Sequence, residues 1–417
     1  MKSNDIAAIL DQLCSIYDQS VANLREALGA YCGNGTPPDP DQRAKGAFAY
    51  PELRVTYQGE QTAGRFTRAF ARLTQPGVYA CSVARPKMFR DYLKTQLEFL
   101  AADYGVEIEV GRSSSEIPYA YVLDGSGINV DNVTPAELSR WFPSNELSHI
   151  GDEIADGAWD YSLREARPLA LFDGPRTDFS LARLKHYTGT DPEHFQHFIL
   201  FTNYVRYVDE FVRFAIDELR REDSPYTGLS VPGGFYDRGH LTDAEAQVAA
   251  GTWRRHQMPA YHLIADGRVG ITLVNIGVGP SNAKTICDHI AVLRPEVWLM
   301  IGHCGGLRPT QRIGDYVLAH AYLRDDHVLD DILPVEIPLP AIAEVQRALF
   351  EAAVQVTGGD EDSVKTRLRT GTVVTTDDRN WELRFTQSAK RFNQSRAVAI
   401  DMESATVAAQ GYRFRVP

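Results

Sequence analysis

The sequence lacks an uninterrupted apolar run near its N-terminus. Residues 1–5 lead into an amphipathic segment that contains Asp11 and Asp18, so neither a secretory signal nor a membrane span is predicted. Cysteine is also scarce, because the five cysteines are odd in number and have no regular spacing. This usage fits a reducing compartment, and a cytoplasmic location is expected.

The sequence also has fewer basic than acidic residues. The formal net charge of −12 argues against binding of nucleic acid or of anionic membranes, because neither polyanion is attracted to an acidic surface. The sequence has no visible internal repeat, and its His and Cys residues do not fall at metal-ligand spacing, so no metal site is expected. A small molecule is the expected partner.

What is present is enough chain for two or three domains, with 417 residues and 44% hydrophobic content. Residues 78–83 and 106–110 predict strands and residues 89–104 predict a helix, which indicates an α+β domain over residues 1–180. Apolar residues then recur every 3.6 positions between residues 191 and 221. With Asp191 as the N-cap and Pro192 in the first turn, we expect a helix of about 30 residues and about 45 Å in a connecting segment, residues 181–225.

From residue 226 to 417 the pattern becomes α/β. Residues 270–276 and 297–301 predict buried strands, with a helix over 281–293 between them. Each strand ends in glycines, which allow a ligand to approach the backbone, and ligands of such sheets usually lie at the carboxyl ends of the strands. The glycines fit neither the dinucleotide fingerprint nor the P-loop, because Asn282, Val278 and Ala283 stand where those motifs need glycine.

Met402 and Glu403 follow an apolar, strand-like stretch and precede a predicted helix. A carboxylate at such a junction can accept hydrogen bonds from two vicinal hydroxyls, and a methionine offers an apolar wall for a sugar. The pair therefore predicts a ribose clamp. An ordinary first turn of a helix, in which the dipole favours Glu, is the alternative.

Five glycine- and acid-containing motifs occur in the order found in nucleoside phosphorylase-like N-ribosyl enzymes: residues 277–281, 302–307, 313–317, 371–377 and 401–405. Three further segments resemble the AMP nucleosidase family: residues 85–90, 116–124 and 257–262. The resemblance covers nearly the whole chain. It implies an α/β catalytic domain of nucleoside phosphorylase type, with a mixed central sheet flanked by helices, preceded by an α+β regulatory domain.

The resemblance also implies an activity, which is hydrolysis of the N-glycosidic bond of AMP to adenine and ribose 5-phosphate, in purine salvage and control of the adenylate pool. It implies a homo-oligomer, a hexamer, with ATP as allosteric activator, phosphate as inhibitor and no cofactor. It assigns Glu403 to the ribose hydroxyls and Met402 to the sugar face. Residues expected around the substrate and its base are Gly277, Gly279, Gly302, His303, Thr375, Thr376, Asp377 and Trp381. For the Thr375 segment, a strand end closed by a Thr/Asp turn is the alternative.

Phosphate groups need cations or backbone amides. Candidates for the 5'-phosphate of AMP are Arg238, His240, His303 and Arg308, each of which is equally readable as a solvated charge. The cluster Arg85, Lys87 and Arg90 is a candidate effector site, and a solvated helix start is the alternative for it.

Two departures from the phosphorylase pattern disfavour phosphate as the nucleophile: His303 replaces a common serine, and Met300 replaces a common arginine. A third departure concerns the aspartate that protonates the purine. In related enzymes it lies on the strand after the Met-Glu helix, and it is absent from this sequence, which points to a chain shortened at its C-terminus. A catalytically silent AMP-binding or regulatory subunit and a phosphate-dependent phosphorylase therefore remain as alternatives.

Overall fold

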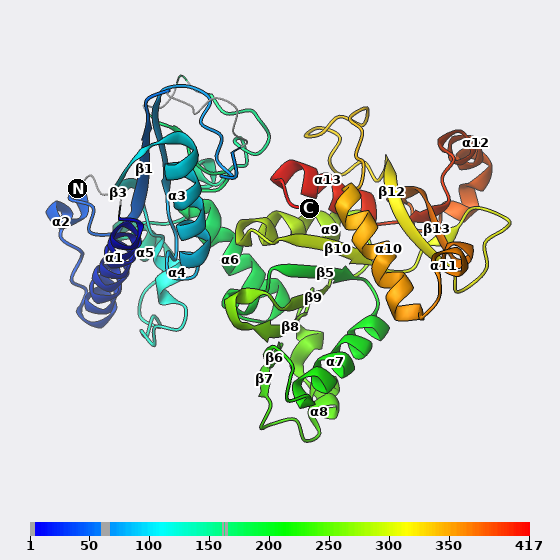
Figure 1. Ribbon diagram of the computed structural model, residues 1–417. Helices are drawn as coiled ribbons and strands as arrows, with labels where there is room; N and C mark the ends of the chain where they lie inside the picture. The colour runs from blue at the N-terminus through cyan, green and yellow to red at the C-terminus, as the bar shows by residue number, and fades with distance from the viewer. Residues whose placement is uncertain (1–4, 60–66, 161, 163–165) are drawn as a thin grey trace. The chain divides into compact units, whose positions relative to one another are not determined.

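The computed structural model describes residues 5–59, 67–160, 162 and 166–417. It divides into two compact units, Met1–Ala182 and Arg183–Pro417 (Figure 1). The first unit combines helices with one sheet, and the second combines helices with two mixed sheets. The predicted order, an α+β unit followed by an α/β unit, is confirmed, with the mixed strands of the second unit divided between two sheets.

The first unit is built on a four-stranded sheet in the order β3-β1-β2-β4. Helix α1 begins after Asp5, whose side chain accepts from two backbone N–H groups, and ends at Gly35 in the left-handed conformation. Apolar residues of α1 and α3 pack against β1 and β3 to form the core, and Figure 1 shows both helices against these strands. The strands are β1 (Ala49–Tyr57), β2 (Gly77–Ser82), β3 (Glu107–Glu116) and β4 (Arg167–Pro168). The helices are α1 (Ile6–Asn34), α2 (Pro40–Ala44), α3 (Arg90–Tyr104), α4 (Tyr119–Leu123), α5 (Pro135–Trp141), η1 (Leu147–His149) and α6 (Gly174–Thr188), in which the division between the units falls.

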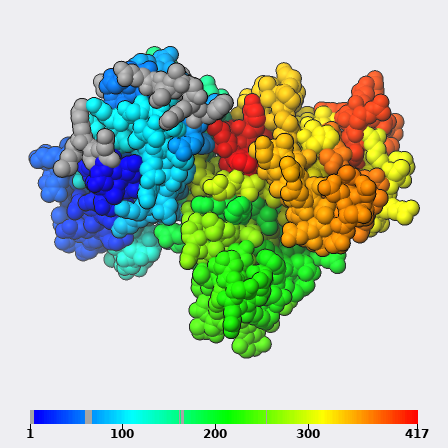
Figure 2. All heavy atoms as spheres, in the orientation of Figure 1, coloured from blue at the N-terminus to red at the C-terminus, as the bar shows by residue number. Residues whose placement is uncertain are grey.

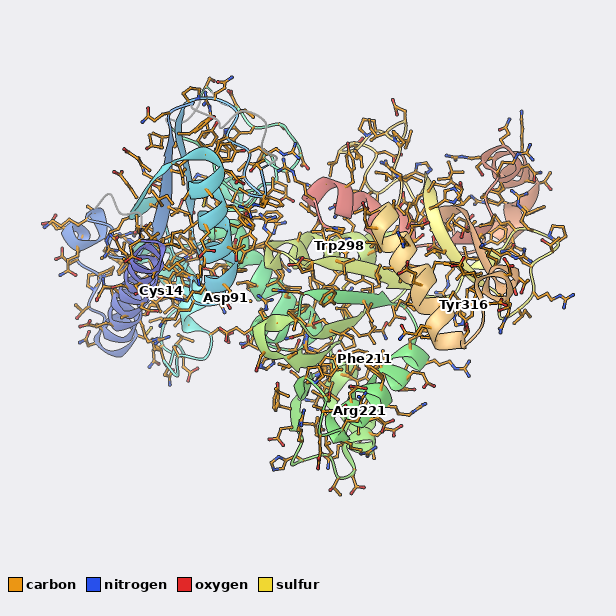
Figure 3. All side chains as sticks on the ribbon, in the orientation of Figure 1. Cys14, Asp91, Phe211, Arg221, Trp298 and Tyr316 are labelled. Atoms are coloured by element: carbon orange, nitrogen blue, oxygen red, sulfur yellow. The ribbon has the colours of Figure 1, made fainter. Side chains whose placement is uncertain are left out.

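The second unit contains a six-stranded sheet in the order β10-β5-β9-β8-β6-β7. β10, β5 and β9 run parallel, and the remaining neighbours are antiparallel. Helix α7 buries one apolar face, including Phe211, against β6, β8 and β9 (Figure 3). The strands are β5 (Phe198–Thr202), β6 (Tyr226–Val231), β7 (Gly234–Asp237), β8 (Ala260–Ala265), β9 (Ile271–Asn275) and β10 (Val297–Ile301). The helices are η2 (Pro192–His194), α7 (Val205–Arg220), α8 (Ala244–Ala250), η3 (Thr252–Arg255), η4 (Asp266–Arg268), α9 (Pro280–Ile290) and η5 (Ala291–Leu293).

A second sheet of this unit has the order β11-β14-β13-β12. Helix α13 contacts α9 and β10 as well as β12 and β13, so it joins the two sheets. Trp298 on β10 (Figure 3) holds this helix closely, because a Cβ placed on Gly411 would lie 3.0 Å from its indole nitrogen. The strands are β11 (Gly305–Gly306), β12 (Tyr316–Asp325), β13 (Leu368–Thr376) and β14 (Ala399–Asp401). The helices are α10 (Ala343–Thr357), α11 (Glu361–Arg367), η6 (Trp381–Arg384), α12 (Phe385–Ser395) and α13 (Ser404–Phe414).

The prediction of one helix over residues 191–221 is wrong. Asp191 does cap a helical turn, but that turn is the short η2, and the chain then enters β5 before α7 begins at Val205. β5 is a central strand between β10 and β9. Its apolar residues are spaced so that they continue the helical period of α7, which is why the pattern read as one helix.

Helix α10 differs from α7 in its burial. None of its 15 residues, all of which the structure describes, is buried. Val356 is 86% exposed and Ile342, which caps the helix, is 43% exposed. Figure 2 shows α10, in orange, on the visible surface of the second unit. Within the described parts of the chain, no helix combines the length and apolar character needed to cross a bilayer.

Candidate functional site

Glu403 lies where β14 ends and α13 begins, as predicted. Its side chain is buried, with 1% of the residue exposed, and each carboxylate oxygen accepts one hydrogen bond. The backbone N–H of Gly279 donates to Oε1 at 2.7 Å, and the Asn203 amide donates to Oε2 at 3.1 Å. Each oxygen keeps a lone pair for a further donor. Met402 directly precedes it and is half-buried.

Burial raises the pKa of Glu403 to about 7. The N–H of Gly279 and the amide of Asn203 favour the charged form, whereas the nearby Asp401 disfavours it. Gly279 caps the N-terminus of α9, where the helix dipole also favours a negative charge. The carboxylate therefore lies between two states near neutral pH, and donors supplied by a ligand would favour the ionised one.

Thr375 and Asp401 tie together the strands that present Glu403. The Thr375 hydroxyl donates to Asp401 Oδ1 at 2.5 Å and accepts from the backbone N–H of Ala405 at 2.9 Å. The other oxygen of Asp401 accepts from the Ser404 N–H at 3.0 Å. Thr375 is fully buried and Asp401 is half-buried, and burial raises the pKa of Asp401. The structure thus gives Thr375 a positioning role at the start of α13.

The other residues predicted to border the base lie at the end of β13 and along the chain that follows it. Thr376 is buried and accepts from the N–H of Asp378 at 3.2 Å, whereas Asp377 is exposed. Trp381 packs with Ile400 in a small core, and a Cβ on Gly305 would lie 3.3 Å from its ring. In the part of the chain that the structure describes, these contacts stabilise the fold.

The glycine-rich strand ends do meet at Glu403. Gly277 and Gly279 adopt positive φ angles of 67° and 115° between β9 and α9, which favours glycine at both positions. Gly302 and His303 follow β10. The His303 ring lies 4.3 Å from the ring centroid of Tyr204 and 5.5 Å from that of Tyr207.

Asn203, Tyr204 and Tyr207 were missed by sequence reasoning. All three follow β5, so their place at the site became visible only with the strand. The Tyr207 hydroxyl lies 3.4 Å from His303 Nε2. With Glu403, these residues line the carboxyl ends of the parallel strands β5, β9 and β10, which is where ligands of such sheets bind.

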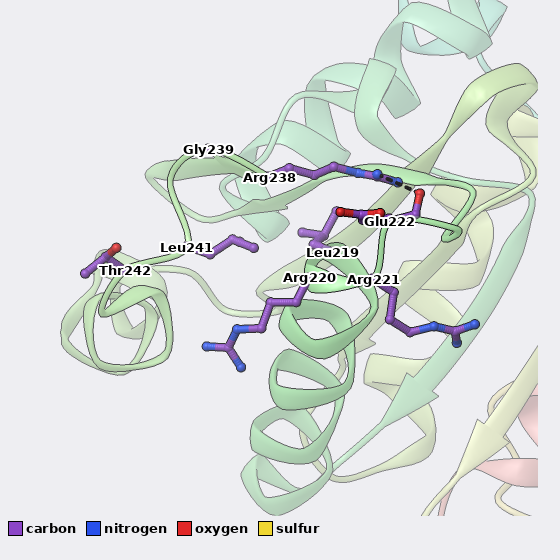
Figure 4. A pocket seen from close by; sticks show the side chains of 8 residues that line it. All are labelled: Leu219, Arg220, Arg221, Glu222, Arg238, Gly239, Leu241 and Thr242. Atoms are coloured by element: carbon purple, nitrogen blue, oxygen red, sulfur yellow. Dashed lines mark hydrogen bonds between the residues drawn. The ribbon is translucent and has the colours of Figure 1, made fainter.

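The structure corrects the placement of Arg238 and His240. β7 runs antiparallel to β6, with Gly228 opposite Asp237, so both residues lie at the end of the sheet opposite Glu403. Arg238 donates to the backbone oxygens of Glu222 and Tyr226, and His240 pairs with Asp237 at 2.7 Å. Figure 4 shows Arg238 reaching toward Glu222. The cavity there, about 490 Å³, is lined by Leu219, Arg220, Arg221, Glu222, Arg238, Gly239, Leu241 and Thr242.

Arg308 also lies away from Glu403. β11 runs antiparallel to β14, with Gly305 opposite Ile400 and Gly306 opposite Ala399. The chain at Arg308 has therefore moved toward the beginning of β14, while Glu403 follows its end. Of the four candidates for the 5'-phosphate, only His303 lies beside the clamp.

The basic cluster of the first unit is paired with carboxylates. Arg85 Nε lies 3.3 Å from Asp178, Lys87 lies 2.7 Å from Asp18, and Arg90 lies 2.7 Å from Asp11. Asp178 is fully buried and also accepts from the Tyr50 hydroxyl at 2.8 Å. A cavity of about 580 Å³ adjoins the two exposed pairs, lined by Asp11, Cys14, Ser15, Asp18, Gln19, Ala22, Lys87 and Arg90.

No group of three His, Cys, Asp or Glu side chains in the described residues is arranged to hold a metal ion. The residues around Glu403 instead offer hydrogen-bond donors and acceptors, aromatic faces and glycine backbone. This set suits an uncharged polyol with an aromatic group.

Known families match both units. The chain matches "Bacterial AMP nucleoside phosphorylase N-terminus" over residues 8–166 and "Phosphorylase superfamily" over residues 240–417. The AMP nucleosidases of Escherichia coli strain K12 and of Escherichia coli O157:H7 are each 61% identical to it over 412 residues, which cover 99% of this chain and 84% of theirs. The chain belongs to the AMP nucleosidase family. A crystal structure of AMP nucleosidase from Bacteroides thetaiotaomicron VPI-5482 is 26% identical, with a TM-score of 0.44, covering 58% of this chain and 86% of that chain.

Membership of the AMP nucleosidase family agrees with the order of the units. The first family match falls within Met1–Ala182 and the second within Arg183–Pro417. Glu403, Gly279 and Gly302 lie within the residues that match the phosphorylase superfamily, and Asn203 precedes that match within the second unit.

Proposed function

We propose that this chain hydrolyses the N-glycosidic bond of AMP to adenine and ribose 5-phosphate, in purine nucleotide salvage and control of the adenylate pool. The observation that carries the proposal is the 61% identity to AMP nucleosidases over 99% of the chain. The position of Glu403, with one free lone pair on each oxygen, supports it.

The geometry accounts for part of the chemistry. Cleavage of the bond to the base builds positive charge on the ribose, which a carboxylate fixed against the sugar stabilises. Glu403 is fixed in this way by Gly279 and Asn203, and hydroxyls that donate to it keep it ionised. His303, Tyr204 and Tyr207 form a wall of rings beside Gly302, where aromatic or phosphate parts of the substrate would lie.

Product analysis in phosphate-free buffer tests the proposal. The purified chain should release adenine and ribose 5-phosphate from AMP, and Glu403→Gln should abolish the release. Release that requires added phosphate and yields ribose 1,5-bisphosphate would assign the chain to the phosphorylases instead. Binding of AMP without release of adenine would contradict hydrolysis and leave an AMP-binding role.

We also propose that ATP activates and phosphate inhibits this activity through Arg85, Lys87 and Arg90 in the first unit, which would then be regulatory. Because each of these cations already faces a carboxylate, an effector phosphate would take the place of Asp18 and Asp11. Loss of ATP stimulation in Lys87→Ala together with Arg90→Ala, with unchanged basal turnover, is the expected result. Stimulation equal to that of the unmodified chain would exclude this cluster.

We propose a homohexamer, and the exposed face of α10 supports self-association. Light scattering that gives only the mass of one chain would contradict it.

The five free cysteines support a cytoplasmic location. The acidic net charge supports a small molecule as substrate and no nucleic-acid or membrane partner.

A further inference from the structure

Asn203 holds an unusual place at the carboxyl end of β5. Its Nδ2 donates to Glu403 Oε2 at 3.1 Å. With its nitrogen toward Glu403 Oε2, the amide turns its oxygen to the other side. This orientation suits the ionised form of Glu403, which only accepts hydrogen bonds.

The oxygen that remains is unsatisfied. Asn203 Oδ1 is buried, and none of the described residues donates a hydrogen bond to it. A buried acceptor without a partner is costly, and in native proteins it usually marks a place that a ligand or water completes. Glu403, its neighbour, is the ribose anchor of the proposed function.

Gly302 keeps the space beside this oxygen open. A Cβ placed on Gly302 would lie 3.1 Å from Asn203 Oδ1 and 3.3 Å from Met300 Cε. That approach is tighter than ordinary van der Waals contact, so a side chain at position 302 would press on the oxygen. Glycine at the end of β10 thus avoids a side chain that would crowd Oδ1.

We infer that Asn203 is the second half of the ribose clamp: Nδ2 fixes the Glu403 carboxylate, while Oδ1 accepts a hydrogen bond from one of the two vicinal hydroxyls of the substrate. The inference deepens the proposed function and rests on it. A vicinal diol supplies two donors at neighbouring positions. Glu403 and Asn203 supply acceptors that are likewise neighbours, joined by their own hydrogen bond.

The arrangement makes Asn203 a specificity residue for ribonucleotides. A deoxyribose that lacks the matching hydroxyl leaves Oδ1 buried and unpaired. A site built to bond a hydroxyl discriminates strongly against the analogue that lacks it. We expect AMP to bind about 10- to 100-fold more tightly than the analogue without that hydroxyl.

Calorimetric binding of AMP, 2'-deoxy-AMP and 3'-deoxy-AMP to the full chain tests the assignment. Asn203→Ala should weaken the binding of AMP by about 10- to 100-fold, and it should weaken the binding of one of the two deoxy analogues by the same factor. The other analogue lacks the hydroxyl that donates to Asn203. Its binding should weaken less than that of AMP, because it loses only the effect of Nδ2 on Glu403.

Asn275→Ala is the matched control. Asn275 ends β9, lies beside Thr202 of β5 in the sheet, and accepts from the Gly277 N–H at 3.2 Å. Its replacement should change the affinity for all three nucleotides by one common factor. Asn203→Gln keeps both an amide donor and an amide acceptor, so it should retain the preference for AMP even if Asn203→Ala fails to fold.

The outcomes separate this inference from the proposed function. Equal weakening of the binding of all three nucleotides by Asn203→Ala would overturn the hydroxyl contact. The contact would also be overturned if Asn203→Ala left the affinities of both deoxy analogues equally unchanged, because the effect would then come from Glu403 alone. Wild-type chain that shows this binding pattern without releasing adenine would overturn the hydrolysis and support the inference. No binding of AMP at all would overturn both.

Discussion

The two charged clusters of this protein, the proposed ribose clamp around Glu403 and the basic cluster of the first unit, differ in how far the described residues complete them. Glu403 is buried, its pKa is raised to about 7, and the acceptor Asn203 Oδ1 beside it has no partner among the described residues. In the first unit, Arg85, Lys87 and Arg90 each face a carboxylate.

The difference separates a site from a structural cluster. Polar groups that stabilise a fold are matched within the chain, because an unmatched buried group is costly. Polar groups that bind a substrate are left partly unmatched, since the ligand supplies the missing partners. By this criterion the clamp is prepared for a ligand, whereas an effector would first have to displace carboxylates from the basic cluster.

The largest expected effect is on catalysis. Glu403→Ala should lower kcat/KM for adenine release from AMP by about 10²- to 10⁴-fold, because the charge that develops on the ribose loses its fixed carboxylate. Steady-state kinetics with an adenine assay measures it. Glu361→Ala removes an exposed acid of α11 that pairs with Lys365 and should leave kcat/KM unchanged. A loss of less than about 10-fold in Glu403→Ala would remove Glu403 from the reaction.

The next effect is on the stability of the first unit. Arg85→Met leaves Asp178 fully buried without its cation, so the free energy of unfolding should fall by about 2–4 kcal/mol. Chemical denaturation measures the change. Asp178→Asn in addition to Arg85→Met should recover most of it, because the uncompensated charge is then gone. A double variant as unstable as the single one would show that Arg85 acts by packing.

The pH dependence of stability is expected to be slightly smaller. The pKa of Glu403 is about 7 in the folded chain and 4.5 in its reference state, so the folded protein binds more protons between these values. The contribution of Glu403 to stability should therefore fall as pH rises from about 4.5 to 7, by about 3 kcal/mol.

Glu403→Gln isolates this contribution. The difference in unfolding free energy between the unmodified chain and Glu403→Gln should grow in favour of the variant as pH rises through this window. Denaturation at pH 5 and pH 8 gives the two differences. A difference that is the same at both pH values would show that the pKa of Glu403 is not raised in the fold.

The smallest effect concerns the two exposed pairs of the basic cluster. The side chains of Lys87 and Asp18 are 70% and 52% exposed, and those of Arg90 and Asp11 are 40% and 70% exposed. Exposed pairs add little to stability, so Lys87→Ala and Arg90→Ala should each shift Tm by less than about 2 °C. Calorimetric scans measure the Tm of each variant and compare its shift with that of Arg85→Met. A shift in Tm as large as that of Arg85→Met would show that the exposed pairs contribute as much to stability as the buried pair of Arg85 and Asp178.

Much of the second unit could be predicted from the sequence because its signals are local. The strands predicted over 270–276 and 297–301 are β9 (Ile271–Asn275) and β10 (Val297–Ile301), and the intervening helix is α9 (Pro280–Ile290) followed by a 3-10 turn. Each of them has a glycine at or near at least one end. Glu403 could be placed at a strand-to-helix junction for the same reason, since both neighbouring elements carry their own pattern.

Asn203 could not be predicted, because the error over residues 191–221 concealed it. A five-residue apolar strand directly before an amphipathic helix continues the helical period, and periodicity cannot separate the two. Inside a helix, Asn203 would have been one polar residue among several. At the end of a central parallel strand, it faces the carboxylate of Glu403.

Arg238 and His240 failed for a different reason. Their charge and the neighbouring glycine are typical of a phosphate site, but the sequence does not state which end of the sheet a hairpin delivers them to. The antiparallel pairing of β6 and β7 carries both residues to the end opposite Glu403. The direction of a strand within its sheet is a long-range property, and short motifs do not contain it.

Helix α10 makes the amide hydrogen exchange of this chain a measure of its assembly. An isolated helix of 15 residues is marginal in water, and most helices in proteins persist because an apolar face is packed. α10 packs no fully buried residue within its own chain, so its amides should open at low cost in a dissociated subunit. If the chain associates through this face, the same amides should become protected as concentration rises, while those of α7 stay protected throughout.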